Sequence, residues 1–412
     1  MNPSPATNWT HRPEHRSWLA AETARLLQFS ARSRHPDGGF AWMDERGRPD
    51  LGRPVETWIT TRMTHVLSVG TVMGIPGCAP LVDHGIASLQ TNLADAEFEG
   101  WFSASDRPNQ GEKRAYEQAF VLLAATSATV AQRPGALSLL EDAVATIESR
   151  FWDDDRGLMI DVKSRDWSQQ EPYGGANANM HSVEAFLAAA DVTDNPVWLE
   201  RALRIAQFFI YQNARANHWR IPEHFDADWT ELPDYNLATP AHQFRPYGAT
   251  VGHGFEWSRL CLHLSASLTA VNGHAPEWLI EAACGLFDRA TTDGWQGDGF
   301  LYTTDWSGTP VVSDRLHWVV CEAIAAAAAL HRVTGDEPYH ALYRRWWDLA
   351  ETSFIDRDGG SWFAQLDSSN QPAASVWSGK PDTYHAFQAT LLPRLPLAPS
   401  LVTGVSHGLL DT

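Results

Sequence analysis

Residues 322–330 read Glu-Ala-Ile-Ala-Ala-Ala-Ala-Ala-Leu, a run that would place small or apolar side chains on nearly every face of a helix. A helix at the surface of a protein needs a polar face, so this segment is predicted to be surrounded by other helices. On both sides of it, segments with apolar residues at spacings of three and four alternate with short connectors rich in Gly, Asp and Pro. This pattern is typical of helices joined by turns, and it predicts an all-α chain.

The same units recur along the chain. About twelve helices are predicted, near residues 14–34, 56–74, 79–94, 112–131, 135–151, 179–190, 196–213, 248–271, 275–291, 313–335, 338–354 and 382–391. Several amphipathic helices end at an aromatic and acidic connector, after which come a glycine-led β-hairpin and a more apolar helix. The short β-hairpins are expected at residues 39–43, 157–161, 299–303 and 360–364. The repetition predicts six helical hairpins closed into an (α/α)6 barrel, with residues 1–412 as a single domain.

Composition limits the partners that this chain can have. The 412 residues carry a formal net charge of −19. That charge opposes contact with phosphate backbones and anionic lipids, so we expect neither nucleic acid nor a membrane as a partner. The N-terminal residues lack the apolar stretch of a secretory signal, so we expect a cytoplasmic protein. The cysteines are widely spaced and are expected to be free thiols: Cys78, Cys261, Cys284 and Cys321.

Polar groups recur at the predicted starts of the apolar helices. His181, His253 and His385 each precede a polar residue by three positions, and His317 lies five before Glu322. Residues three apart share one face of a helix. The other candidates at helix starts are Trp58, Arg62, Tyr116, Asn177, Glu256 and Trp318. Because the inner helices of a barrel converge on one rim, these side chains are predicted to meet in one pocket, and imidazole is the side chain best suited to move protons near neutral pH.

Each candidate taken alone has a structural alternative. A lone histidine at a helix start is more often a cap or a buried hydrogen-bonding group, Arg62 alone is more often an ion-pair partner, and tryptophans are often core residues. Recurrence at equivalent positions favours at least two catalytic histidines. The His-x-x-Glu spacing also resembles that of di-metal helical bundles, but the bridging carboxylates cannot be assigned, so neither a metal nor a cofactor is expected. Asp226, Asp228 and Glu256 are carboxylates for a glycosidase that no spacing supports.

Four ordered strings resemble those of the N-acylglucosamine 2-epimerase superfamily, and within it the branch of mannose and sulfoquinovose isomerases. They are Asn177-Ala-Asn-Met-His-Ser-Val-Glu-Ala185, Gly252-His-Gly-Phe-Glu-Trp-Ser-Arg-Leu260, Leu316-His-Trp-Val-Val-Cys-Glu-Ala323 and Lys380-Pro-Asp-Thr-Tyr-His385. The resemblance covers nearly the whole chain. It implies an (α/α)6 barrel and a metal-independent aldose–ketose isomerase that acts on a monosaccharide, interconverting D-mannose and D-fructose through a cis-enediol.

The resemblance also implies roles for the candidates. His253 and His385 match the two histidines that exchange protons with the sugar, and the residues that match substrate contacts are Trp58, Arg62, Tyr116, Asn177 and His181. We expect neutral His385 to move a proton between C2 and C1 and His253, oriented by Glu256, to assist ring opening. Arg62 would hold the oxygen that becomes negative. Trp58 and Trp318 would present flat faces to the sugar.

Four alternatives stay open at this point. They are a sulfoquinovose isomerase, a sugar 2-epimerase of the same fold, a sugar-binding barrel without catalysis, and a metal-dependent hydrolase or lyase. The segment Tyr116-Glu-Gln-Ala-Phe120 departs from the histidine-containing variants that sulfosugar members carry after this tyrosine, which favours mannose. Residues 217–243 are rich in Trp, His and Asp and poor in periodicity, so they are a candidate lid over the rim.

Overall fold

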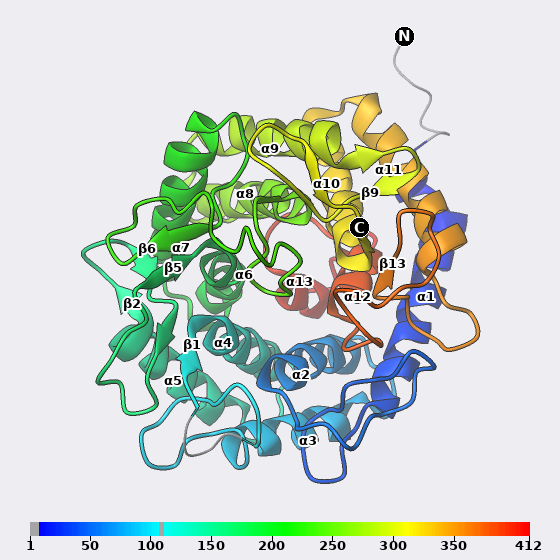
Figure 1. The fold of residues 1–412 in the computed structure, drawn as a ribbon. Helices are drawn as coiled ribbons and strands as arrows, with labels where there is room; N and C mark the ends of the chain where they lie inside the picture. Colours follow the sequence, from blue (N-terminus) through cyan, green and yellow to red (C-terminus); the bar gives the residue numbers. More distant parts are fainter. Residues whose placement is uncertain (1–7, 107–110) are drawn as a thin grey trace.

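Two concentric rings of helices form the protein, as the computed structural model of residues 8–106 and 111–412 shows (Figure 1). The inner helices are α2 (Thr57–Val72), α4 (Ala115–Val130), α6 (Ala176–Thr193), α8 (Val251–Asn272), α10 (His317–Thr334) and α12 (Tyr384–Leu391). Each inner helix contacts the next, and α12 contacts α2, which closes the ring. The predicted (α/α)6 barrel is therefore confirmed.

Each outer helix packs mainly on one inner helix, and several also contact the next one. They are α1 (Pro13–Arg32), α3 (Cys78–Gln90), α5 (Ala136–Thr146), α7 (Val197–Ala206), α9 (Trp278–Gly294) and α11 (Glu337–Leu349). Three of them, α5, α7 and α11, continue into π-helical turns at 147–151, 207–214 and 350–354. The outer helices bury one face, whereas α10 buries every residue from Val319 to Leu330. The alanine-rich run therefore lies inside the barrel, as its composition predicts.

Short antiparallel strands set where the inner helices begin. The pairs are β1 (Lys113–Arg114) with β4 (Val162–Lys163), β2 (Trp152–Asp153) with β3 (Leu158–Met159), β5 (Tyr173–Gly175) with β6 (His224–Asp226), β8 (Trp295–Gln296) with β9 (Gly299–Phe300), and β12 (Arg315–Leu316) with β13 (Gln365–Leu366). A three-stranded sheet joins β7 (Ala249–Thr250), β10 (Thr303–Thr304) and β11 (Pro310–Val312). Strands β1, β5, β7 and β12 run directly into α4, α6, α8 and α10.

A repeated hydrogen bond holds the helix starts in register. The first amide of α2, α4, α6, α8 and α10 donates to a carbonyl in the next connector along the chain. The pairs are Thr57 to Ser103, Ala115 to Asp161, Ala176 to Glu223, Val251 to Tyr302, and His317 to Ala364. These bonds satisfy amides that a helix start leaves free, and they fix the connectors over one end of the barrel.

The predicted helices are confirmed in order, with differences at their ends. The helices expected to begin at 112, 248 and 313 start a few residues later, because residues 113–114, 249–250 and 315–316 pair as strands. The hairpins at 157–161 and 299–303 are present, and those at 39–43 and 360–364 reduce to isolated bridges. The short helix α13 (Leu401–Ser406) was not predicted. It contacts α2, α4 and α6 inside the ring.

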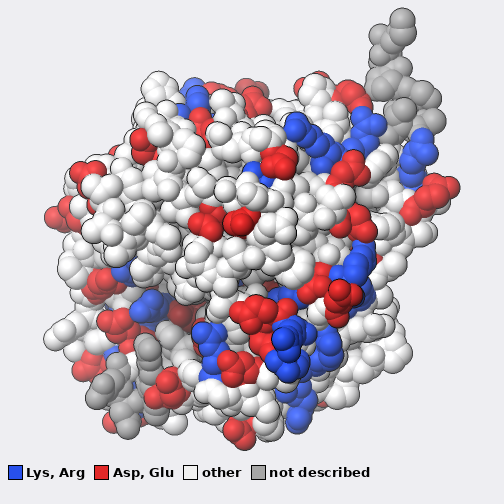
Figure 2. All heavy atoms as spheres, turned by 45° about the vertical axis from the view of Figure 1, so that its right-hand side comes forward, with Lys and Arg blue, Asp and Glu red and all other residues white. Residues whose placement is uncertain are grey.

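Acidic and basic side chains are interspersed on the face drawn in Figure 2. Within the described residues, no helix combines the length and the apolar character that crossing a bilayer requires. The first seven residues, part of the N-terminal stretch behind the cytoplasmic expectation, lie outside the described residues. The four cysteines are free thiols, and three of them are buried.

Candidate active site at the rim of the barrel

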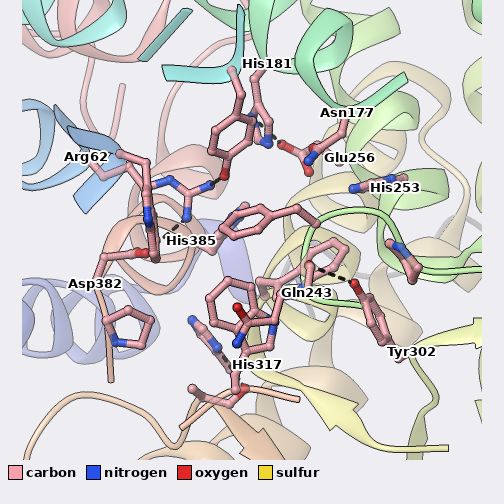
Figure 3. A pocket seen from close by; sticks show the side chains of 18 residues that line it. Arg62, Asn177, His181, Gln243, His253, Glu256, Tyr302, His317, Asp382 and His385 are labelled. Carbon is pink, nitrogen blue, oxygen red and sulfur yellow. Dashed lines mark hydrogen bonds and ion pairs between the residues drawn. The ribbon is translucent and has the colours of Figure 1, made fainter. Parts of the chain in front are cut away.

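The starts of the inner helices surround a pocket at one end of the barrel (Figure 3). It encloses about 640 Å³ of space, including its opening to solvent. All of the residues that sequence analysis proposed for catalysis and sugar binding line it: Trp58, Arg62, Tyr116, Asn177, His181, His253, Glu256, Trp318 and His385. His317 lines it as well. The expectation that the helix starts converge on one pocket is therefore met.

His385 is held by a carboxylate from the neighbouring inner helix. Its Nδ1 lies 2.8 Å from Oε1 of Glu322 on α10, and both side chains are buried. The other oxygen of Glu322 accepts from Nε of Arg259 on α8 at 2.9 Å. Burial raises the pKa of Glu322, but the charge of Arg259 and the contact with His385 outweigh it and leave that pKa well below its usual value. An ionised Glu322 directs Nδ1–H of His385 toward itself and leaves Nε2 for the pocket.

His253 has a different carboxylate partner from the one expected. Its Nδ1 lies 2.9 Å from Oε1 of Glu223, which belongs to the connector before β6. The prediction that Glu256 orients His253 is wrong. Glu256 lies about one turn further along α8, inside the barrel, where its carboxylate faces other helices and not His253. Glu223 sits in the aperiodic segment 217–243, where no spacing marked it as a site residue.

Glu256 and His181 face each other without a hydrogen bond. Nδ1 of His181 is 3.6 Å from Oε1 of Glu256, and both atoms are buried without a hydrogen-bond partner among the described residues. Burial and the nearby Glu322 raise the pKa of Glu256 well above its usual value. Burial and the charge of Arg62 lower the pKa of His181 well below its own. These shifts favour a protonated Glu256 and an unprotonated His181, and both forms can make hydrogen bonds with sugar hydroxyls.

Arg62 is the buried cation of the pocket. Its Nη1 donates to Oδ2 of Asp382 at 3.0 Å, and its Nη2 donates to the Tyr116 hydroxyl at 2.9 Å. Burial lowers the pKa of Arg62, but Tyr116 and Asp382 outweigh that effect and keep the guanidinium charged. Its Nε is buried and has no partner among the described residues. The pocket therefore holds a positive charge with an unused donor.

Trp318 lies between the two paired histidines. Its ring centroid is 5.4 Å from that of His253 and 5.8 Å from that of His385. Gly252 makes this possible, because a Cβ atom there would come within 2.1 Å of the Trp318 ring. On the other side, Trp58 packs edge to face against Phe244 and Trp377. The two tryptophans lie where a flat apolar surface for a sugar ring is expected.

Several lining residues were missed by sequence analysis. Asp382 lies three positions before His385 and ahead of α12, whereas the spacing rule looked three positions after each histidine, so the rule did not find it. Gln243 and Tyr302 had no such signal. Nε2 of Gln243 donates to the carbonyl of Val376 at 2.7 Å, and the Tyr302 hydroxyl donates to the carbonyl of Gln243 at 3.2 Å. The end of the candidate lid 217–243 is thus tied across the pocket to two other connectors.

The His-x-x-Glu units do not pair within themselves. Glu184 accepts hydrogen bonds from Tyr384 and Gln388 on α12, not from His181. Among the residues that the structure describes, two groups have ligand atoms close enough for a metal ion: His181 with Glu184 and Glu256, and Glu256 with Glu322 and His385. The Arg259 guanidinium already lies among these carboxylates, 2.9 Å from Glu322, 3.8 Å from Glu256 and 3.9 Å from Glu184. A divalent cation there would meet the repulsion of this buried charge.

Residues 38–389 match the family described as N-acylglucosamine 2-epimerase (GlcNAc 2-epimerase). The chain belongs to this family. Among the relatives of this epimerase-family chain, a protein of Thermobifida fusca named D-mannose isomerase is 52% identical over 402 residues, which cover 96% of this chain and 98% of the relative. A D-mannose isomerase of Pseudomonas cannabina pv. alisalensis is 50% identical over 404 residues, which cover 97% of each chain.

Two solved structures have the same fold as this chain. A crystal structure of a D-mannose isomerase superposes with a TM-score of 0.84 at 29% identity, covering 91% of this chain and 96% of the other. The cellobiose 2-epimerase from Spirochaeta thermophila DSM 6192 gives a TM-score of 0.80 at 21% identity, covering 95% of this chain and 98% of the other. At 21% identity, the similarity to the cellobiose 2-epimerase supports only the fold.

Proposed function

We propose that this protein is an aldose–ketose isomerase that interconverts D-mannose and D-fructose. The observation that carries the proposal is the pair of histidine–carboxylate units, His385 with Glu322 and His253 with Glu223, on either side of Trp318 in one pocket. The D-mannose isomerases at 52% and 50% identity over nearly the whole chain support the choice of sugar. The same proposal makes the protein a cytoplasmic, single-domain enzyme that needs no metal or cofactor and acts on a free monosaccharide.

His385 is proposed as the base that moves hydrogen between the carbons. In the open-chain aldose, neutral Nε2 takes the proton from C2, the C–H electron pair forms the C1–C2 double bond, and O1 gains a proton to give the enediol. The imidazolium returns its proton to C1 as the O2 hydroxyl loses its own and becomes the ketone. Glu322 supports both halves, because a buried carboxylate stabilises the imidazolium that forms between them.

His253 and Arg62 are proposed to handle the oxygens. His253, oriented by Glu223, transfers protons with the ring oxygen during opening and with O1 and O2 afterwards. The free Nε–H of Arg62 is suited to the oxygen on which negative charge develops. A fixed donor of this kind in a site that excludes water lowers a barrier by about 3 kcal/mol. Tyr116, Asn177, His181 and Glu256 are proposed to bind hydroxyls, and Trp58 and Trp318 to face the ring.

The test is incubation of the purified protein with D-mannose in deuterated water, with sugars separated by chromatography. The proposal expects D-fructose as the product and deuterium in the recovered sugar, with or without EDTA. A sugar-binding barrel without catalysis would bind mannose but introduce no label. Formation of D-glucose in place of D-fructose would make the protein a 2-epimerase. A panel of sugars that includes sulfoquinovose tests whether the protein is instead a sulfoquinovose isomerase. Loss of activity in EDTA would contradict the metal-independent mechanism.

A further inference from the structure

The pocket at the rim of the barrel, which is the proposed substrate site, is called the sugar pocket below. A second cavity adjoins it, and we call this second cavity the side chamber. It lies beside the starts of α2, α4 and α6 and encloses about 950 Å³, including its opening to solvent. It shares Trp58, Tyr116, Asn177 and Phe244 with the sugar pocket, so one wall separates the two cavities. None of the proposed proton transfers uses it.

The side chamber is lined by a buried carboxylate with an unused oxygen. Glu117, in the first turn of α4, is 6% exposed, and its Oε2 has no hydrogen-bond partner among the described residues. Burial raises the pKa of Glu117 to about 6, although the charge of Arg114 and the Ser103 hydroxyl favour its ionised form. A buried acceptor without a donor reduces stability, and such groups are rare unless a ligand or water completes them.

An unused donor lines the same cavity. Arg114 precedes α4, and its Nε is buried without a partner, although Nη2 lies 3.4 Å from Glu112. The other arginine of the side chamber, Arg245, is already paired with Glu171 at 2.8 Å and with Asp161 at 3.3 Å. Two buried polar atoms in the lining of the side chamber thus lack a partner among the described residues: the acceptor Oε2 of Glu117 and the donor Nε–H of Arg114.

This combination matches hydroxyl groups. A hydroxyl both donates and accepts hydrogen bonds. Neighbouring hydroxyls on one molecule can therefore donate to a carboxylate and accept from a guanidinium at the same time. A simple anion would be repelled by the four carboxylates of the lining, which are Glu56, Asp106, Glu117 and Asp161, whereas the hydroxyls of a neutral polyol can donate to carboxylates and accept from Arg114. The rings of Trp58, Tyr116 and Tyr173 also line the side chamber and offer apolar faces to the C–H groups of a polyol.

We propose that the side chamber is a second carbohydrate site, which binds a neutral monosaccharide or alditol through hydroxyls on Oε2 of Glu117 and Nε of Arg114. The occupant is a molecule separate from the one that reacts. Because Trp58, Tyr116, Asn177 and Phe244 belong to both cavities, an occupant of the side chamber contacts the wall of the sugar pocket. The inference does not depend on the proposed isomerase reaction.

D-Mannitol tests the proposal, because it has no carbonyl group and cannot be isomerised. Crystals of the full-length protein are soaked in mannitol, and its binding in solution is measured by titration calorimetry. The variants are Glu117→Gln, which keeps the size of the side chain, and Arg114→Met, which keeps an unbranched apolar chain but removes the guanidinium at a partly exposed position. The matched control is Glu200→Gln, at an exposed position in the first turn of α7. Thermal unfolding monitors the fold of each variant.

The expected result is mannitol density in the side chamber, with hydroxyls at hydrogen-bond distance from Glu117 and Arg114. Each of the two site variants should weaken this binding about tenfold, the effect of losing one hydrogen bond to a charged group, and the control should not change it. A side chamber without mannitol at concentrations that saturate the sugar pocket overturns the proposal. Binding in the side chamber that neither variant weakens also overturns it. If Glu117→Gln does not fold, Arg114→Met decides alone.

Discussion

The two histidine–carboxylate units of the sugar pocket look alike but are built from different parts of the barrel. Glu322, which holds His385, comes from the inner helix α10 and is paired with the buried Arg259. Glu223, which holds His253, comes from a connector, and among the described residues no arginine pairs with it. The first unit is part of the packed centre of the ring, and the second depends on a segment laid over the rim. A base at a carbon needs an exact position, whereas proton transfer among oxygens tolerates more movement.

The largest effect is expected from His385→Asn. Because the proposed base is removed, exchange of the C2 hydrogen with solvent should fall by about 10³-fold or more. Deuterium incorporation into D-mannose, followed by NMR, measures this. The melting temperature should stay close to that of the unmodified protein. Exchange retained within tenfold would mean that another group takes the proton.

His253→Asn is expected to cost less, about 10²-fold in turnover. Sugars open spontaneously to some extent, so a site without this histidine still receives open-chain substrate. Initial rates of ketose formation, compared directly with those of His385→Asn, provide the measurement. If His253→Asn proved the more damaging change, the two proposed roles would have to be exchanged.

Glu322→Gln is expected to lower kcat/KM by about 10²-fold, because a neutral amide no longer stabilises the imidazolium of His385. It should also reduce the free energy of unfolding by about 3 kcal/mol, since Arg259 loses a buried partner. Urea unfolding and steady-state kinetics measure the two effects. The exposed Glu200→Gln serves as the control. If the variant were as stable as the unmodified protein, the carboxyl groups of Glu184 and Glu256 would be enough to stabilise the buried charge of Arg259.

Glu322 also predicts how the stability of the fold depends on pH. The pKa of Glu322 is depressed in the folded protein, so its ionised form stabilises the fold above the usual glutamate pKa of about 4.3. That contribution is lost as the pH falls below this value. Acid unfolding curves should therefore be less steep for Glu322→Gln than for the unmodified protein. Parallel curves would contradict the depressed pKa.

Glu223→Gln is expected to have the smallest effect, about tenfold in kcat/KM and about 1 kcal/mol in stability. The amide can still accept from Nδ1 of His253, and no buried arginine is left without its partner. The same kinetic and urea measurements apply. A loss of stability equal to that of Glu322→Gln would remove the distinction between the two units.

Much of the fold follows from local sequence. The alanine-rich run 322–330 predicted a helix enclosed by others, and the recurrence of helix pairs predicted the closed ring, because both depend only on which side chains are apolar and at what spacing. The candidate site residues were found for the same reason, since they recur at equivalent helix starts. Asp382 was missed because it precedes α12, where helical spacing does not apply. Strands β1, β7 and β12 were missed because two-residue strands depend on partners far along the chain.

The sequence by itself determined the barrel and the residues that gather at its rim, because helical periodicity and composition are local properties. Only the tertiary structure decided which carboxylate holds which histidine. Glu223 is 30 residues before His253, and Glu322 is 63 residues before His385, so neither pair is a neighbour on one helix. For this reason the prediction that Glu256 orients His253 was wrong. Contacts between separate helices depend on how the ring closes, and no spacing within a single helix specifies that closure.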